Sequence, residues 1–105
     1  MNTYIAFVTV PPKEADSLAE KILEARLAAC VNIMPLVKSK YWWKDNIETD
    51  EESLLIIKTA ESKSDELIEF VKTHHSYEVP EVIFMPIIKG NDDYLSWLVT
   101  ETTKK

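Results

Sequence analysis

The thiol and imidazole side chains of the sequence are few: the single cysteine, Cys30, and the two histidines, His74 and His75. A thiolate is a good ligand for Cu(I), and imidazole suits Cu(II) and Zn(II). Cys30 and His75 are therefore a suitable metal pair if the fold brings them together. Each also has a structural alternative. Cys30 fits as a small buried apolar side chain, and the histidines fit at a helix C-terminus, where the dipole attracts an imidazolium.

Wider metal and catalytic motifs are absent from the 105 residues. The sequence has no C-x-x-C, no H-E-x-x-H, no pair of histidines at helical spacing and no glycine-rich phosphate loop. A nucleophilic Cys30 needs a base and an orienting third group, and His75 is the one suitable base. A phosphatase needs positive charge for its substrate, but Arg26 is the one arginine. We therefore expect a binding protein rather than an enzyme.

The charge balance argues against other classes of protein. Lys and Arg number 12 against 18 Asp and Glu, and the net charge of −6 repels a phosphate backbone. No apolar run approaches the ~18 residues of a membrane-spanning helix. We thus expect neither a nucleic-acid nor a membrane partner.

A single cysteine favours a reducing compartment, and the initiating Met1 argues against a removed signal peptide, so we expect a cytoplasmic location.

Hydrophobic periodicity predicts the element order β-α-β-β-α-β-α. The expected strands cover 4–10, 29–43, 53–59 and 82–88, and the expected helices cover 12–28, 62–74 and 92–99. Pro35 predicts a bend, a bulge or an edge position in the second strand, because proline donates no hydrogen bond to a ladder. A turn at 44–46 closes a long hairpin, with the acidic residues of 48–52 at a solvated tip that could gather divalent cations loosely.

The ends of the two later helices carry capping signals. Ser62 and Asp65 form a capping-box pattern at the start of the second helix, and Asn91 precedes the third.

This order is that of the ferredoxin-like α+β sandwich, βαββαβ, with an additional C-terminal helix. Right-handed crossovers put both long helices on one face and are expected to create parallel strand pairs, whereas the hairpin gives an antiparallel pair. The segments 54–57 and 82–85 are apolar on both faces, which one layer of helices cannot cover. We expect the second face to pack against other subunits, with Leu55 or Ile57 toward the partner. Trp42 and Trp43 fit packing or interface positions.

Several separated motifs resemble the CutA family, the divalent-cation tolerance proteins. They are L-A-A-C-V-N-I at 27–33, S-K-Y-W-W-K at 39–44, I-K-T at 57–59, H-S-Y-E-V-P-E at 75–81 and Y-L-S-W-L at 94–98. Their order and spacing match from the first strand to the last helix, so the resemblance implies a single CutA-like domain over residues 1–105. Two positions depart from the pattern: Asp45 stands where Gly is usual, and Ser76 stands where Pro is usual.

The resemblance implies a ferredoxin-like fold, a homotrimer similar to the PII signalling proteins, and an association with copper and other divalent cations. It favours the metal hypothesis for Cys30 and His75. Lys58, His75, Tyr77 and Glu81 resemble the polar residues that line inter-subunit clefts in the family. We expect these four to converge near a subunit boundary, because the strand end with Lys58 and the loop before the last strand should open at one end of the sheet.

The function predicted from the sequence is that of a trimeric, cytoplasmic divalent-cation tolerance protein. Copper is the expected metal, other divalent cations are further candidates, and the expected process is metal homeostasis or response. The alternative is a PII-like trimeric signalling module that binds a small ligand in the cleft between subunits.

Overall fold

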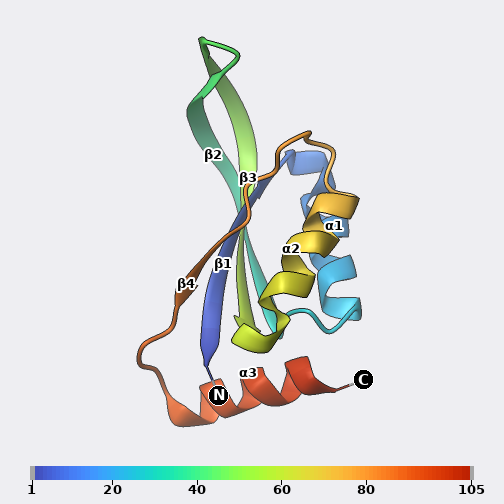
Figure 1. Ribbon diagram of the computed structural model, residues 1–105, viewed down its shortest axis with the longest axis vertical. Coiled ribbons are helices and arrows are strands. Elements are labelled where there is room, and N and C mark those ends of the chain that lie inside the picture. Colours follow the sequence, from blue (N-terminus) through green and yellow to red (C-terminus); the bar gives the residue numbers. More distant parts are fainter. Residues whose placement is uncertain (1, 105) are drawn as a thin grey trace.

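The computed structural model describes residues 2–104, which fold as an α+β sandwich (Figure 1). Residues 1 and 105, the ends of the predicted domain, lie outside the described residues. The elements are β1 (Thr3–Val10), α1 (Pro12–Glu24), β2 (Cys30–Trp43), β3 (Asn46–Ala60), a 3-10 turn (Glu61–Lys63), α2 (Ser64–His74), β4 (Ile83–Pro86) and α3 (Asp92–Thr103). The predicted ferredoxin-like order with an additional C-terminal helix is confirmed.

The four strands form one sheet in the order β2-β3-β1-β4, and every neighbouring pair is antiparallel. The expected parallel strand pairs are therefore not neighbours in the sheet. Each crossover helix does join two parallel strands, but the two βαβ units interleave. β3 separates β1 from β2, and β1 separates β3 from β4.

The core lies between the sheet and the layer formed by α1 and α2 (Figure 1). Alternate residues of the central strands point into it, because successive strand side chains face opposite ways. The buried apolar core residues include Ala6, Val8, Leu55 and Ile57 from the sheet and Leu18, Ile22, Leu67 and Val71 from the helices. Leu55 and Ile57 thus face the helices, and the expectation that one of them faces a partner subunit is wrong.

The first helix ends four residues before the predicted boundary. Arg26 has a φ of 58°, a left-handed conformation that breaks the helix, and the Leu27 amide bonds back to the Ile22 carbonyl. This turn lets Leu27 and Ala28 enter the core as loop residues. Periodicity extended the helix because those two residues are apolar and at helical spacing.

The hairpin of β2 and β3 is confirmed, and its two strands continue beyond the sheet as a two-stranded ribbon, residues 37–43 and 46–52 (Figure 1). β3 begins at Asn46 rather than at 53, so the acidic residues between 48 and 52 pair along the ribbon and do not form the tip. A register shift between Met34 and Val37 confirms the bulge predicted at Pro35, whose carbonyl accepts a hydrogen bond from Ser53 Oγ at 2.8 Å.

The predicted caps of α2 and α3 differ in outcome. The α2 helix begins at Ser64, and no side chain caps it, so the predicted Ser62 cap is not formed. Instead a 3-10 turn precedes the helix, and Ser64 Oγ donates to the Glu61 carbonyl at 2.8 Å. The Asn91 cap of α3 is confirmed, because its Oδ1 accepts from the Asp93 amide at 2.9 Å.

The sheet face opposite α1 and α2 carries apolar side chains that the chain itself leaves partly exposed. They include Phe7, Met34, Leu54, Ile56, Ile83 and Met85. α3 covers the end of the sheet near the N-terminus (Figure 1), where Glu101 Oε1 pairs with Arg26 Nη1 at 3.0 Å. The middle of the face has no covering layer among residues 2–104.

Candidate functional site

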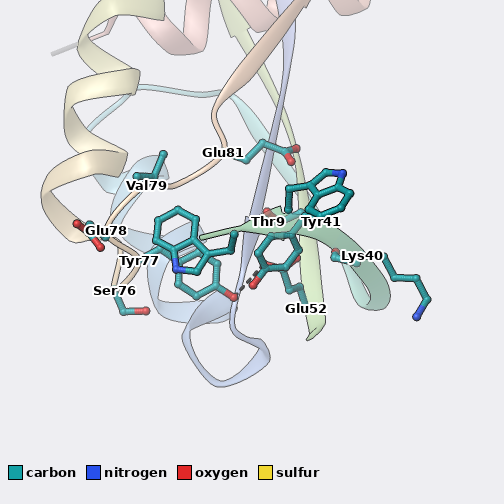
Figure 2. Close-up of a pocket in the computed structure, with 12 residues that line it drawn as sticks. Thr9, Lys40, Tyr41, Glu52, Ser76, Tyr77, Glu78, Val79 and Glu81 are labelled. Carbon is teal, nitrogen blue, oxygen red and sulfur yellow. Dashed lines mark hydrogen bonds between the residues drawn. The ribbon is translucent and has the colours of Figure 1, made fainter. Parts of the chain in front are cut away.

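A groove opens where the ribbon leaves the body of the sheet, beside the loop 75–82 that follows α2 (Figure 2). Its volume is about 770 Å³. It is lined by Thr9, Ser39, Lys40, Tyr41, Trp42, Trp43, Glu52, Ser76, Tyr77, Glu78, Val79 and Glu81. Two of the predicted ligand-binding residues, Tyr77 and Glu81, therefore share this groove.

A hydrogen bond between β3 and the loop crosses the groove. Tyr77 Oη donates to Glu52 Oε2 over 2.9 Å (Figure 2). Glu52 is only 4% exposed, because it stands where β3 passes from the ribbon into the covered sheet. Burial, and then the hydrogen bond to Glu52, raise the pKa of Tyr77 well above its ordinary value. The tyrosine therefore remains a donor to the buried carboxylate at neutral pH.

His75 fastens the same loop to β1. Its Nε2 lies 2.7 Å from the Thr9 carbonyl oxygen, and its Nδ1 accepts from the Tyr77 amide at 3.0 Å. This pattern fits the tautomer with its proton on Nε2. The side chain is 8% exposed, and its ring packs against Tyr77 with 4.6 Å between centroids. Both ring nitrogens are therefore engaged within the chain.

A second contact fixes the loop to the helical layer. Ser76 Oγ donates to Glu14 Oε2 of α1 at 2.9 Å. The residue that departs from the family pattern thus replaces the stiffness of a proline with a hydrogen bond.

Two further carboxyl groups lie in or beside the groove: Glu81 lines it, and Asp50 is the partner of the lining residue Tyr41. Glu81 has a pKa raised above its ordinary value, first by burial and then by the charge of Glu52. Asp50 accepts a hydrogen bond across the ribbon from Tyr41 Oη, and this bond is the main cause that raises the pKa of Tyr41 to about 12. The ribbon and the loop therefore bring carboxylates and phenol rings together.

Cys30 and Lys58 occupy a different place, near α3. They stand opposite each other on β2 and β3, and both side chains donate to Asn32 Oδ1. Tyr94 of α3 is close to Cys30, and burial, followed by the thiol, raises the pKa of this tyrosine. The Cys30 thiol is half-buried.

The five predicted site residues thus fall into two groups within one chain. Lys58 pairs with Ile5 of β1, whereas His75 binds Thr9, so the groups lie at opposite ends of the sheet. Four residues of extended strand span roughly 13 Å. The expectation that Lys58 and the loop open at one end is wrong. β3 and β4 are parallel, so the end of β3, which carries Lys58, and the start of β4, which follows the loop, lie at opposite ends of the sheet. Cys30 and His75 are separated for the same reason.

Sequence reasoning did not place Glu52 and Tyr41 in the groove, or Asp50 beside it as the partner of Tyr41. The sequence carries a signal for their placement, since a two-residue turn at 44–45 sets the hairpin register and puts Tyr41 opposite Glu48 and Ser39 opposite Asp50. The burial of Glu52 has no such signal, because it depends on the loop that folds over it.

Within residues 2–104, no three side chains of His, Cys, Asp or Glu stand together so as to hold a metal ion. In the same part of the chain, no helix has the length and apolar character needed to cross a membrane.

The sequence profile of the CutA1 divalent ion tolerance protein family matches residues 4–101. The chain belongs to this family. A rice relative, "Protein CutA 1, chloroplastic", is 54% identical over 99 residues, which are 93% of this chain and 56% of the rice protein. A Thermus thermophilus relative, "Divalent-cation tolerance protein CutA", is 43% identical over 93% of this chain and 96% of its own length. The recognition of CutA motifs in the sequence is confirmed.

Solved CutA1 structures share the fold. The rice CutA1 crystal structure superposes with a TM-score of 0.94 at 48% identity, covering all of this chain and 96% of the other. The Thermus thermophilus structure gives 0.91 at 41% identity, covering 94% of this chain and 97% of the other. The chain spans about half the length of the plant and animal curated CutA relatives that it matches.

The expected cytoplasmic location is wrong as an inference from this domain. CutA relatives from rice and Arabidopsis thaliana are named chloroplastic, and the Archaeoglobus fulgidus CutA structure is described as periplasmic. Similar CutA domains are thus found under names that specify different compartments. The single cysteine and the initiating Met1 therefore do not determine its location.

Proposed function

We propose that this CutA chain acts in divalent-cation tolerance as a homotrimer that binds copper, with other divalent cations bound more weakly. The supporting observation is its membership of a family whose Thermus thermophilus and Escherichia coli members are named divalent-cation tolerance proteins. The net charge of −6 favours attraction of cations over anions. The proposed activity is binding rather than catalysis.

The uncovered sheet face supports the homotrimer. Leu54 and Ile56 of β3 lie beside Met34 and Phe7 on that face. A sheet that exposes one face to water normally alternates apolar and polar side chains, whereas this one is apolar on both faces. A second and third copy of the chain would remove these side chains from water.

Cys30 is the proposed ligand for Cu(I), because a thiolate is the softest donor in the sequence. His75 is the second proposed ligand. To bind a metal ion, its ring would have to break its hydrogen bond to Thr9 or to Tyr77. Within one chain the two residues are too far apart to share one ion, so a joint site requires residues from neighbouring subunits.

Metal titration of the native protein tests this proposal. Copper should bind more tightly than zinc, cobalt or manganese, following the general order of divalent affinities. Binding of Cu(I) should release protons if the Cys30 thiol is a ligand, since the thiolate is the binding form. Cys30→Ser should weaken Cu(I) binding and leave the circular dichroism spectrum unchanged. An unchanged affinity would remove Cys30 from the ligand set, and an absence of copper binding would overturn the proposal.

A second function is favoured by the groove, which offers a place for a small polar ligand as in a PII-like signalling module. Tyr77 and Glu81 line the groove, and Tyr77 is held in place by its hydrogen bonds to the buried Glu52 and to His75. A thermal-shift screen of small ions tests it, because a ligand that binds the folded protein raises its melting temperature. Failure of every ion in the screen would argue against this function.

A further inference from the structure

Aromatic rings form much of the wall of the groove. Tyr41, Trp42 and Trp43 come from the ribbon, and Tyr77 comes from the loop that follows α2. The face of such a ring carries negative electrostatic potential and attracts cations. Trp43 already has one cation nearby, since Lys44 Nζ lies 5.9 Å from the centroid of its ring. The ring is therefore placed where an ammonium group can approach it.

The charges of the groove have one dominant sign. Glu52 and Glu81 both line it, and neither forms an ion pair with a lysine or arginine of residues 2–104. The one lysine in the lining, Lys40, extends away from the two carboxylates (Figure 2) and donates to Thr49 Oγ1 at 3.0 Å. A cation in the groove would thus meet uncompensated negative charge.

The two phenol hydroxyls of the groove are not free to donate to a ligand. The hydroxyl of Tyr77 is committed to Glu52, and that of Tyr41 is committed to Asp50. Both ring nitrogens of His75 are occupied as well. An anion needs donors or positive charge, and a soft metal needs a free thiol or imidazole. An organic cation needs neither, since it binds through carboxylates and ring faces.

We propose that this groove binds an organic cation of the alkylammonium class, between the ring faces of Tyr41, Trp43 and Tyr77 and beside the carboxylates of Glu52 and Glu81. This inference rests on the small-ligand function proposed for the groove and is independent of copper binding. The cavity, at about 770 Å³, falls within the range of small-molecule sites. Bound charge would also relieve the repulsion between the two glutamates.

Calorimetric titration of the native protein with choline tests the inference. Dimethylbutanol, the uncharged carbon isostere of choline, has the same shape and serves as the control ligand, and citrate serves as the anionic control. Choline should bind, and dimethylbutanol should bind at least about fivefold more weakly, since the charge supplies the cation–π and carboxylate attraction. Citrate should not bind measurably.

Variants then locate the site. Glu81→Gln removes one charge and keeps the shape of the side chain, so the fold is retained, and choline affinity should fall about fivefold. Trp43→Leu keeps an apolar side chain but removes the ring, and the affinity should fall about threefold. Trp97→Leu is the matched control, because Trp97 lies on α3 and outside the groove, and it should leave choline binding unchanged.

The outcomes separate this inference from the proposed ligand function. Equal binding of choline and dimethylbutanol, or preferential binding of citrate, would overturn the organic-cation assignment while leaving a ligand groove. Choline binding that Glu81→Gln and Trp43→Leu do not weaken would also overturn it, because the cation would then bind elsewhere. No binding by any of the three probes would overturn both the assignment and the groove function. Copper titration of the same protein reports on the metal proposal separately.

Discussion

At the scale of single residues, His75 is a structural anchor for the groove. Its two ring nitrogens join β1 to the loop, and its ring supports Tyr77. The neighbouring His74 is exposed, stacks on Phe70 and accepts or donates only within α2. His75 therefore contributes more to stability than His74, because the His75 side chain is buried between β1 and the loop.

We predict that His75→Ala lowers the free energy of unfolding by about 2–4 kcal/mol, since it removes two hydrogen bonds and leaves a cavity. His74→Ala is the matched control and should cost less than about 1 kcal/mol, as surface substitutions usually do. Urea denaturation at a fixed subunit concentration measures both values. Equal costs for the two variants would show that the anchoring contacts of His75 contribute nothing.

Glu81 gives a prediction about pH. Its pKa in the folded chain is raised by burial and by Glu52, so the folded state holds its proton at pH values where the unfolded state has released it. Stability therefore falls as pH rises from the ordinary carboxyl pKa through the raised one. Glu81→Gln lacks this loss, so its stability relative to the parent should be higher at neutral pH than at about pH 4. A difference that stays constant between these pH values would contradict the assignment.

Only some residues of the candidate site could be grouped from the sequence. Tyr77 and Glu81 could be grouped because only three residues separate them in one loop. Lys58 could have been excluded from the predicted fold alone, since its strand and the strand after the loop are parallel. The burial of Glu52 could not be predicted, because an acidic run normally indicates a solvated segment. Glu52 becomes buried only because the loop 75–82 folds over β3.

At the scale of elements, the ribbon is the feature that builds the groove. Its turn has two residues, Lys44 and Asp45, with φ values of 49° and 67°. Positive φ at both central residues is the type I′ pattern, which fits the twist of a hairpin and favours Asn and Gly. Asp45 tolerates this conformation, but a side chain there costs free energy that glycine avoids.

We predict that Asp45→Gly raises the free energy of unfolding by about 0.5–1 kcal/mol, because it removes the left-handed strain at that position. Asp45→Ala keeps the Cβ atom and should give no gain. Thermal melts at equal subunit concentration compare the two variants with the parent. A gain in the alanine variant equal to that in the glycine variant would attribute the effect to the lost charge instead.

The hairpin also shows why element type was easier to predict than element boundaries. Runs of apolar and aromatic residues identified both strands, and Pro35 marked the bulge correctly. The start of β3 was missed by seven residues because Glu and Asp are uncommon in strands. Here they are accommodated by cross-strand partners such as Lys38 and Tyr41, which a single-strand pattern does not include.

At the scale of the whole molecule, the single chain leaves a projecting ribbon and an uncovered apolar sheet face. Its dimensions are 44 × 26 × 23 Å, the long one set by the projecting ribbon (Figure 1). Helices cover one sheet face, and the other leaves Ile83 and Met85 about half exposed, at 53% and 49%. Apolar surface of this kind on a folded domain is typical of an interface.

We predict that the parent protein is a trimer in light scattering and that Leu54→Asp converts it to smaller species. Leu54 lies on the uncovered face, paired with Met34 and Thr9, whereas its neighbour Leu55 points into the core. A carboxylate buried in the interface without a partner costs several kcal/mol, so assembly should fail. Leu23→Asp is the matched control, because Leu23 is exposed on α1, on the opposite side of the sheet, and it should retain the mass of the parent. Circular dichroism separates loss of assembly from loss of fold. A parent that is monomeric at micromolar concentration, or a Leu54→Asp variant that keeps the mass of the parent, would show that this face is not what holds the subunits together.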